Sequence, residues 1–439
     1  MKNIGEYYFS SFIAKINGDY DLNDFNKWTD SQKSTVFHEF FHFYQNCSTV
    51  YGQINISRIC NIVATIHNYE KETFTIPYFI KDLEISEGLF DKYYVPNQDW
   101  DDITFFLHSE IKNDRKIEED IRKSGLSNLK NEAIEYASVC AVIKNKENKE
   151  NKEFILDGLA ICETMIAMIE ENLFPKSTNY IEKYPYYLAK KISNEIRNKI
   201  KWTNEILIFI CDLCLNFFNP GVIFLKFLNS LDENITEIKF SDITNFFDKL
   251  SYRTYSETQN KFIEYSYEEY VDTHRKKVIS DLKNLITAKY YNSAIDWIEN
   301  GINSVSVIRK ELLSMILEHK KFYNYYDYDW FLNILNLGYP IFKLYDKNKD
   351  ENEYFLFGKK LKDDVQWAYW YGIESFLNLL GKKNINNIIC PFYSNCKNSD
   401  KEECSLEPFD QYKNKDCEFQ HFMSIFNLEN KNIVWNNIV

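Results

Sequence analysis

The sequence predicts a mainly α-helical protein with an α+β arrangement in its N-terminal part. Glycine and proline are scarce, with 12 and 8 residues in a chain of 439, so few positions interrupt a helix. Several long segments place apolar residues three to four positions apart, which is the helical period. Short aromatic segments before residue 28, such as Tyr7-Tyr8-Phe9, instead predict one or two strands ahead of the first helix.

A chain of this length is expected to form two or three domains. We place one boundary at about residue 220, because Asn219-Pro220-Gly221 should end a helical stretch. Residues 1–220 would then form the first domain and residues 221–385 a helical domain. Residues 386–439 would form a cysteine-rich C-terminal segment.

The elements follow in order. After the first helix, the N-terminal part is expected to contain helices at about 54–68, 131–139, 156–173, 184–200 and 203–217, and extended segments at 73–76 and 78–80. The helical domain is expected to contain amphipathic helices at about 257–285, 304–322 and 365–380.

The first helix carries a pattern of metal-ligating residues, His38-Glu39-Phe40-Phe41-His42. Its start is predicted at Thr29, because a glutamine follows three residues later as in a capping box. Two histidines four residues apart lie on one face of a helix, one turn apart. They can therefore bind a single zinc ion, with Glu39 beside them to activate the water on the metal.

Apolar residues surround this pattern, among them Val36, Phe37, Phe43 and Tyr44, so the helix should be buried. Two imidazoles and a carboxylate are costly to bury without partners, and a metal would supply them. The alternative is a buried helix whose histidines are hydrogen-bonded without any metal.

A catalytic zinc usually has three protein ligands and one position open for water. The metzincin continuation H-E-x-x-H-x-x-G-x-x-H is excluded, because Gln45 and Ser48 stand where it has glycine and histidine. We therefore expect an acid from the apolar helix at 156–173. Glu163 is favoured, since it lies mid-helix with no Lys or Arg three or four residues away. Asp157 is the alternative, although an N-cap role would also explain it.

Other polar residues have less defined roles. Glu170 lies two turns beyond Glu163 on the same face, where it could orient a histidine or be the solvated end of the helix. Several residues could donate a hydrogen bond to a developing oxyanion, or could simply be packing or surface residues. These are His67, His108, Tyr51 and the cluster Tyr184-Pro185-Tyr186-Tyr187.

These motifs resemble the gluzincin type of zincin, in which H-E-x-x-H is completed by a glutamate on a following helix. The stretch from His38 to Gly52, H-E-F-F-H-F-Y-Q-N-C-S-T-V-Y-G, also resembles bacterial zincin-like proteins that carry H-E-[YF]-x-H-F-x-Q and then Tyr-Gly. Those proteins place their later acid in an E-S-M-A-like helix, which Glu163-Thr164-Met165-Ile166-Ala167 resembles. The gluzincin pattern E-G-x-A instead resembles Asp157-Gly158-Leu159-Ala160. The resemblance covers roughly the first 190 residues.

The resemblance implies a zincin-like catalytic domain and a zinc metallopeptidase with His38, His42 and Glu163 on the metal. Zinc would lower the pKa of its bound water, Glu39 would take the proton, and the hydroxide would attack a peptide carbonyl. A protein or peptide substrate is then the expected partner. Two alternatives stay open: a hydrolase of non-peptide amides, and a non-catalytic helical scaffold with structural metal sites.

The C-terminal segment contains Cys390, Cys396, Cys404 and Cys417, with the spacing C-x5-C-x7-C-x12-C. Four thiolates could hold a second, structural zinc ion or an iron–sulfur cluster. The spacing contains no C-x2-C or C-x4-C pair, so thiols without a metal are the alternative. Cys211 and Cys214 do form C-x2-C, but within an apolar helix, where buried structural cysteines are expected.

The charge and the apolar segments limit the classes of partner. A formal net charge of −13 argues against a general nucleic-acid binder, which would have a basic face. No apolar run is long enough to span a bilayer, and the first residues lack the apolar core of a signal peptide. We therefore expect a cytoplasmic protein with reduced cysteines and no membrane partner.

Overall fold

The structure is a computed structural model that describes part of the chain. The described residues are 5–8, 12–18, 20–21, 24, 27–76, 104–108, 139–144, 151–156, 158–175, 186–217, 220–250, 252–256, 261–285, 292–318, 340–346, 351–355, 390 and 417–435.

Helices dominate the described residues, so the predicted mainly helical class is confirmed. The helices are α1 (Asp30–Ser48), α2 (Val50–His67), α6 (Gly158–Leu173), α7 (Leu188–Ile196), α8 (Asn204–Cys214), α9 (Pro220–Ser230), α10 (Phe240–Phe247), α11 (Tyr267–Leu285), α12 (Asn292–Glu318) and α17 (Glu418–Ile425). The strands are β1 (Gly5–Tyr8), β2 (Ile13–Asn17), β3 (Thr73–Ile76), β4 (Thr104–His108), β5 (Val139–Lys144), β6 (Asn151–Leu156), β7 (Tyr252–Ser256), β8 (Lys261–Tyr265), β9 (Ile341–Asp346), β10 (Glu351–Phe355) and β11 (Asn432–Trp435).

The helix α1 begins where the sequence predicts. The Thr29 hydroxyl accepts a hydrogen bond from the Gln32 amide (3.2 Å), and the Gln32 side chain accepts one from the Thr29 amide (2.8 Å). This reciprocal pair satisfies two amide groups that the first helical turn leaves without intrahelical partners. Every residue from Lys33 to Ser48 is buried. The helix is therefore a core element, and its polar side chains must find partners inside the protein.

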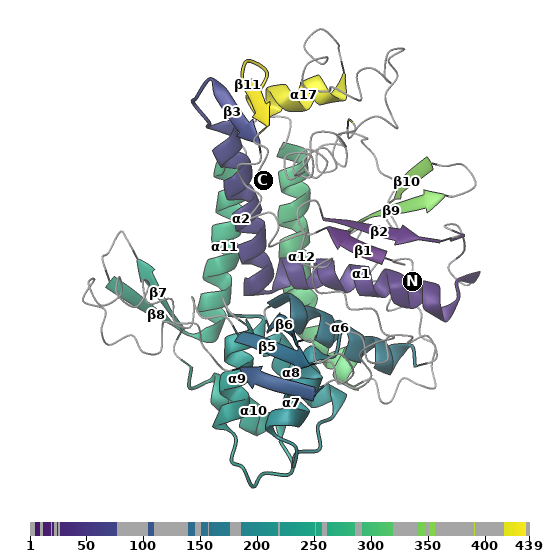
Figure 1. Ribbon diagram of the computed structural model, residues 1–439, viewed down its shortest axis with the longest axis vertical. Coiled ribbons are helices and arrows are strands. Elements are labelled where there is room, and N and C mark those ends of the chain that lie inside the picture. The colour runs from purple at the N-terminus through teal and green to yellow at the C-terminus, as the bar shows by residue number, and fades with distance from the viewer. Residues whose placement is uncertain are drawn as a thin grey trace.

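A mixed sheet lies beside α1, in the order β1-β2-β9-β10 (Figure 1). The β1–β2 and β9–β10 pairs are antiparallel, and β2 pairs with β9 in parallel. Both β1 and β2 pack on α1. The predicted early strands are thus present, and they form the sheet together with strands from the far end of the chain.

Long helices run across the C-terminal end of α1 (Figure 1). The helices α2 and α11 run side by side, and α12 packs against α1 and α11. Below them, α6 packs on α1, α7, α8 and α9. Buried hydrophobic residues from Tyr7 to Leu428 belong to one hydrophobic cluster. The predicted domain boundaries near 220 and 385 stay predictions, and Pro220 is the first residue of α9.

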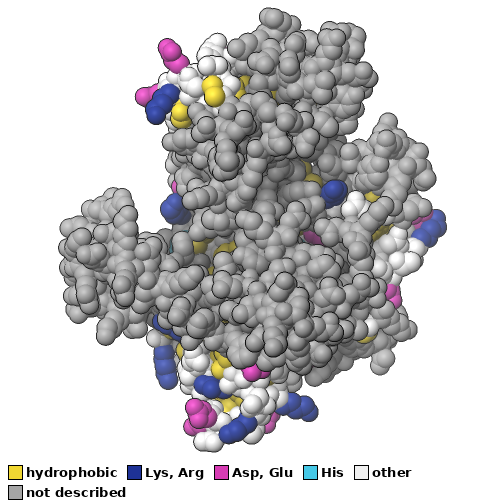
Figure 2. Space-filling view, in the orientation of Figure 1, with side chains coloured by type: hydrophobic (Ala, Val, Ile, Leu, Met, Phe, Trp, Pro, Cys, Tyr) yellow, Lys and Arg dark blue, Asp and Glu magenta, His cyan; other side chains and the backbone are white. Residues whose placement is uncertain are grey.

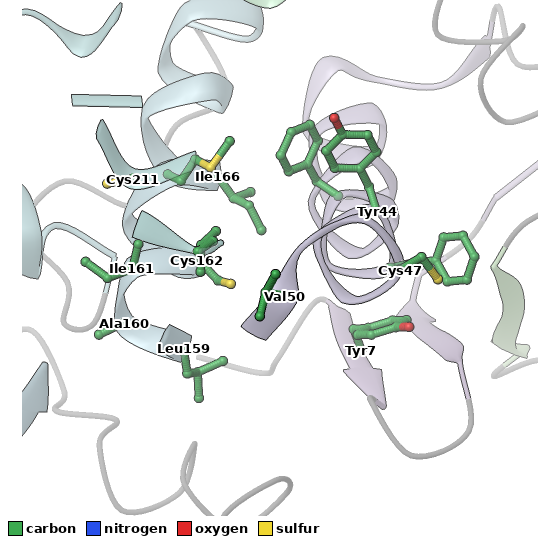
Figure 3. Packing of buried hydrophobic residues seen from close by; sticks show 14 of the residues in the cluster. Tyr7, Tyr44, Cys47, Val50, Leu159, Ala160, Ile161, Cys162, Ile166 and Cys211 are labelled. Atoms are coloured by element: carbon green, nitrogen blue, oxygen red, sulfur yellow. The ribbon is translucent and has the colours of Figure 1, made fainter. Parts of the chain in front are cut away.

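Figure 3 shows how this cluster is packed between α1 and α6. Apolar side chains of α6 face the end of α1, and Val50 lies between the two helices. Tyr44 and Cys47 project from α1, and Tyr7 approaches from β1. The apolar side chains of α6 labelled in the figure are Leu159, Ala160, Ile161, Cys162 and Ile166.

One predicted helix begins later than expected. The stretch 257–285 contains the helix α11 only from Tyr267, because residues 261–265 form the strand β8, which pairs antiparallel with β7. Alternating aromatic and β-branched residues there, such as Tyr252 and Thr254, suit strands. The predicted helices at 54–68, 184–200 and 203–217 correspond to α2, α7 and α8. Residues 78–80 and 365–380 lie outside the described residues.

The surface of the described residues carries charges of both signs. On the face shown in Figure 2, basic and acidic side chains are interspersed at the end of the molecule that contains α9 and α10. Among the described helices, none has a stretch sufficiently long and apolar to cross a bilayer.

Candidate metal centre

The helix α1 presents His38 and His42 on one face, as the four-residue spacing requires. Their ring centroids are 4.8 Å apart, and their Nε2 atoms are 3.2 Å apart. Both rings therefore direct the same nitrogen toward one point between α1 and its neighbour.

Glu163 on α6 reaches the same point. Its Oε1 lies 3.0 Å from His42 Nε2, and its Oε2 lies 3.3 Å from His38 Nε2. These three residues are the group among the described residues whose ligand atoms could hold one metal ion, all within 4.8 Å of one another. Glu163 was the favoured third ligand from the sequence. The alternative, Asp157, lies outside the described residues.

The surroundings of Glu163 suit a cation. The carboxylate is 0% exposed. Its two oxygens lie 3.0 and 3.3 Å from the Nε2 atoms of His42 and His38, so both imidazoles favour the charged carboxylate. In a tetrahedral site with ligand bonds of about 2.0–2.2 Å, neighbouring ligand atoms lie about 3.3–3.6 Å apart. The observed separations of 3.0–3.3 Å are close to this spacing, so the residues fit a zinc-sized ion.

A second carboxylate fixes the orientation of His38. Glu170, two turns along α6, accepts a hydrogen bond from His38 Nδ1 at 2.9 Å, and its other oxygen accepts one from the Ser34 hydroxyl at 2.6 Å. Glu170 is 0% exposed, so it is not a solvated helix end. In the neutral ring protonated on Nδ1, the lone pair of His38 Nε2 is directed toward Glu163. This tautomer is the one that can bind a metal through Nε2.

The protonation of the cluster follows from these distances. Burial raises the pKa of Glu163, but the imidazoles of His42 and His38 outweigh burial and lower it to about 2. Burial lowers the pKa of His38, but Glu170 and Glu163 outweigh it, so that pKa is raised well above its ordinary value. The carboxylates thus hold positive charge at the centre of the cluster, as a proton or as a metal ion.

Glu39, the predicted general base, lies against the first strand of the sheet. A Cβ atom added at Gly5 would come within 2.3 Å of Glu39 Oε1, so any side chain at Gly5 would displace the carboxylate. Glu39 and His38 are each 5% exposed, His42 is 2% exposed and Glu163 is 0% exposed. His38 and Glu39 are therefore slightly more exposed than Glu163.

Two tyrosines flank the imidazoles. Tyr7 of β1 stacks on His42 with ring centroids 6.2 Å apart, and its hydroxyl accepts a hydrogen bond from Asn46 Nδ2 at 3.2 Å. Tyr186 makes an edge contact with His38 at 5.9 Å. Tyr186 belongs to the tyrosine cluster suggested from the sequence. The sequence interpretation missed Tyr7 and Ser34, although Ser34 is one helical turn before His38 and could have been noticed.

The other suggested residues lie in different surroundings. The Tyr51 ring packs where a Cβ of Gly158 would stand, 2.3 Å from it, at the start of α6. His67 ends α2, where its carbonyl accepts a hydrogen bond from Asn427. His108 is the last residue of β4. Tyr184 lies outside the described residues.

The four C-terminal cysteines are only half described. Cys390 and Cys417 are partly buried against the core, whereas Cys396 and Cys404 lie outside the described residues. A second metal site there stays a prediction. Cys211 and Cys214 are buried in α8, as expected for structural cysteines, and burial raises the pKa of both thiols.

The chain matches no protein-family model, no curated protein and no solved structure. Its function therefore has to be inferred from the chemistry of its own residues.

Proposed function

We propose that this protein is a zinc-dependent hydrolase that cleaves peptide bonds, with His38, His42 and Glu163 as the metal ligands and Glu39 as general base. The observation that carries the proposal is the convergence of the buried Glu163 carboxylate with the Nε2 atoms of His38 and His42, at separations of 3.0–3.3 Å. Bound there, zinc would supply Lewis-acid chemistry and would lower the pKa of a water molecule.

The number of ligands favours catalysis over a purely structural metal. Structural zinc sites in proteins usually have four protein ligands, whereas catalytic sites have three. The group of described residues that could hold the metal contains three. A scaffold with a structural metal remains the competing function, and the experiment below distinguishes it.

The roles of the chain's own residues follow from their positions. Glu39 follows His38 in the sequence and is slightly more exposed than Glu163. Its carboxylate would accept a proton from the attacking water and then deliver it to the leaving nitrogen of the substrate. Glu170 would keep the proton of His38 on Nδ1. Tyr186 is half-buried and contacts the ring of His38. It would therefore contact a substrate that reaches the metal past His38.

The test compares the wild-type chain with Glu39→Gln after both are loaded with one equivalent of zinc. Cleavage is followed by mass spectrometry on a mixture of peptides, and zinc content is measured on the same samples. Since general-base catalysis contributes roughly 10²–10⁴-fold, Glu39→Gln should lower the cleavage rate by that factor and keep its zinc.

The matched control is Glu269→Gln, which removes an exposed carboxylate on α11. It should cleave at the wild-type rate. Unchanged cleavage in Glu39→Gln would remove Glu39 from the mechanism. A wild-type chain that binds zinc but cleaves no peptide would favour the scaffold, or a non-peptide amide hydrolase if such amides are cleaved.

A further inference from the structure

A second buried charged cluster lies at the C-terminal end of α1, around Arg309 of α12. The Arg309 guanidinium is buried, at 8% exposure. Its Nη2 donates to the Asp212 carboxylate at 2.7 Å and to the Asp212 carbonyl at 3.3 Å. Its Nη1 donates to Asn216 Oδ1 at 2.6 Å. These bonds hold α12 to the last turn of α8.

The same guanidinium also binds the end of α1. Its Nη1 donates to the carbonyl of Ser48, the last residue of the helix, at 2.9 Å. The last four carbonyls of a helix have no intrahelical donor, and a cation is favourable there because of the helix dipole. In return, the Tyr44 hydroxyl of α1 donates to the backbone carbonyl of Arg309 at 3.0 Å.

Further bonds connect this junction to the metal centre. The Tyr51 amide, at the start of α2, donates to the carbonyl of Leu215 just after α8 at 3.0 Å. Gln45, one turn after His42, donates to the carbonyl of Cys162 at 3.3 Å. Cys162 immediately precedes Glu163, and α8 packs on α6. The end of α1 is thus held to α8 and to the turn of α6 that carries the third ligand.

We infer that Arg309 is a positioning residue for the metal centre: it fixes the end of α1 relative to α8 and α6, and so sets the distance between the two imidazoles and Glu163. This inference rests on the proposed metal site. Metal binding requires ligand positions accurate to about 0.5 Å or better. A small displacement of α1 therefore weakens binding even when the fold is kept.

The experiment measures zinc affinity of the full-length chain by competition with a chromophoric chelator. Arg309→Met, which keeps the aliphatic volume and removes the charge, should weaken zinc binding by at least about tenfold. The visible spectrum of cobalt(II) in the same site should also change, because it reports the arrangement of the ligands.

The matched control is Ile243→Ala in α10, a fully buried residue that does not belong to the junction. It should lose a comparable amount of stability and keep the wild-type zinc affinity. If Ile243→Ala weakens zinc binding as much as Arg309→Met, the effect is one of general stability and the inference is wrong. Unchanged affinity in folded Arg309→Met also overturns it.

A milder variant covers the case in which Arg309→Met does not fold. Tyr44→Phe removes only the hydroxyl that donates to Arg309, and should weaken zinc binding about threefold, the size of one neutral hydrogen bond. Unchanged affinity in Tyr44→Phe would then overturn the inference. Failure of the wild-type chain to bind zinc would instead contradict the proposed function, so the two failures are distinguishable.

Discussion

The Arg309 cluster and the His38–His42–Glu163 cluster are both buried and both contain carboxylates, but among the described residues only the first contains a permanent cation. The Asp212 carboxylate lies 2.7 Å from the Arg309 guanidinium. Burial raises the pKa of Asp212, and Arg309 works against that rise by favouring the charged form. One positive and one negative charge balance, and the cluster can hold helices together by itself.

The His38–His42–Glu163 cluster has no such balance. Two carboxylates, Glu163 and Glu170, converge on imidazoles that are cationic only when protonated. A divalent ion would balance the charge of both carboxylates. The comparison teaches that a buried carboxylate points to a bound cation when the described residues around it offer imidazoles but no Lys or Arg.

The largest expected effect comes from removing an imidazole of the unbalanced cluster. His42→Ala should weaken zinc binding by at least about a thousandfold, because one of three protein ligands is lost. Elemental analysis after dialysis measures the zinc that stays bound to the variant. His274→Ala, on α11, should retain one equivalent of zinc. Retention of zinc by His42→Ala would place the metal elsewhere in the chain.

Next comes the balanced cluster. Asp212→Ala leaves the Arg309 guanidinium buried without its counter-charge, so the free energy of unfolding should fall by about 3–5 kcal/mol. Urea unfolding of the metal-free protein, followed by circular dichroism, measures this change. A loss below about 1 kcal/mol would show that this pair contributes no more than an exposed ion pair.

A smaller effect is expected from the carboxylate that orients His38. Glu170→Gln removes the charge behind Nδ1 and should weaken zinc binding by about 10–100-fold. The control is the next residue: Glu171 binds Tyr187 and Asn204 instead, so Glu171→Gln should stay within about twofold of the wild type. Equal affinities for the two variants would mean that Glu170 has no role in metal binding.

The smallest effect concerns His274 of α11, which lies outside the cluster of His38, His42, Glu163 and Glu170. Burial and the nearby Lys277 lower the pKa of His274 to about 4. The unfolded chain, with an ordinary pKa of about 6.5, therefore binds more protons between these values, and stability falls as the pH drops from about 6.5 to 4.

Because the His274 ring is only half-buried, we expect the free energy of unfolding to fall by on the order of 1 kcal/mol over this pH range. His274→Gln should remove that part of the pH dependence, which is obtained as the difference between wild-type and variant urea unfolding at each pH. Identical pH profiles would show that His274 titrates alike in the folded and unfolded chains.

The sequence was most informative where structure is local. Thr29 and Gln32 predicted the start of α1, because a capping box involves residues three positions apart. It was less well interpreted at 252–265, because the capping box of Ser266 and Glu269, which marks the start of α11, was overlooked. Over so short a segment, the apolar spacing of a helix and the apolar–polar alternation of a strand can fit the same residues.

The sequence by itself determined that two imidazoles share one face of a buried helix, because the helical repeat places residues i and i+4 together whatever the rest of the fold does. Only the tertiary structure decided which groups meet them. Glu163, Glu170 and Tyr7 come from other elements, and Arg309 joins α1 from still further along the chain. The buried pattern of α6 favoured Glu163 and suggested Glu170, but no short-range pattern indicated Tyr7 or Arg309, because their contacts depend on how helices and strands pack.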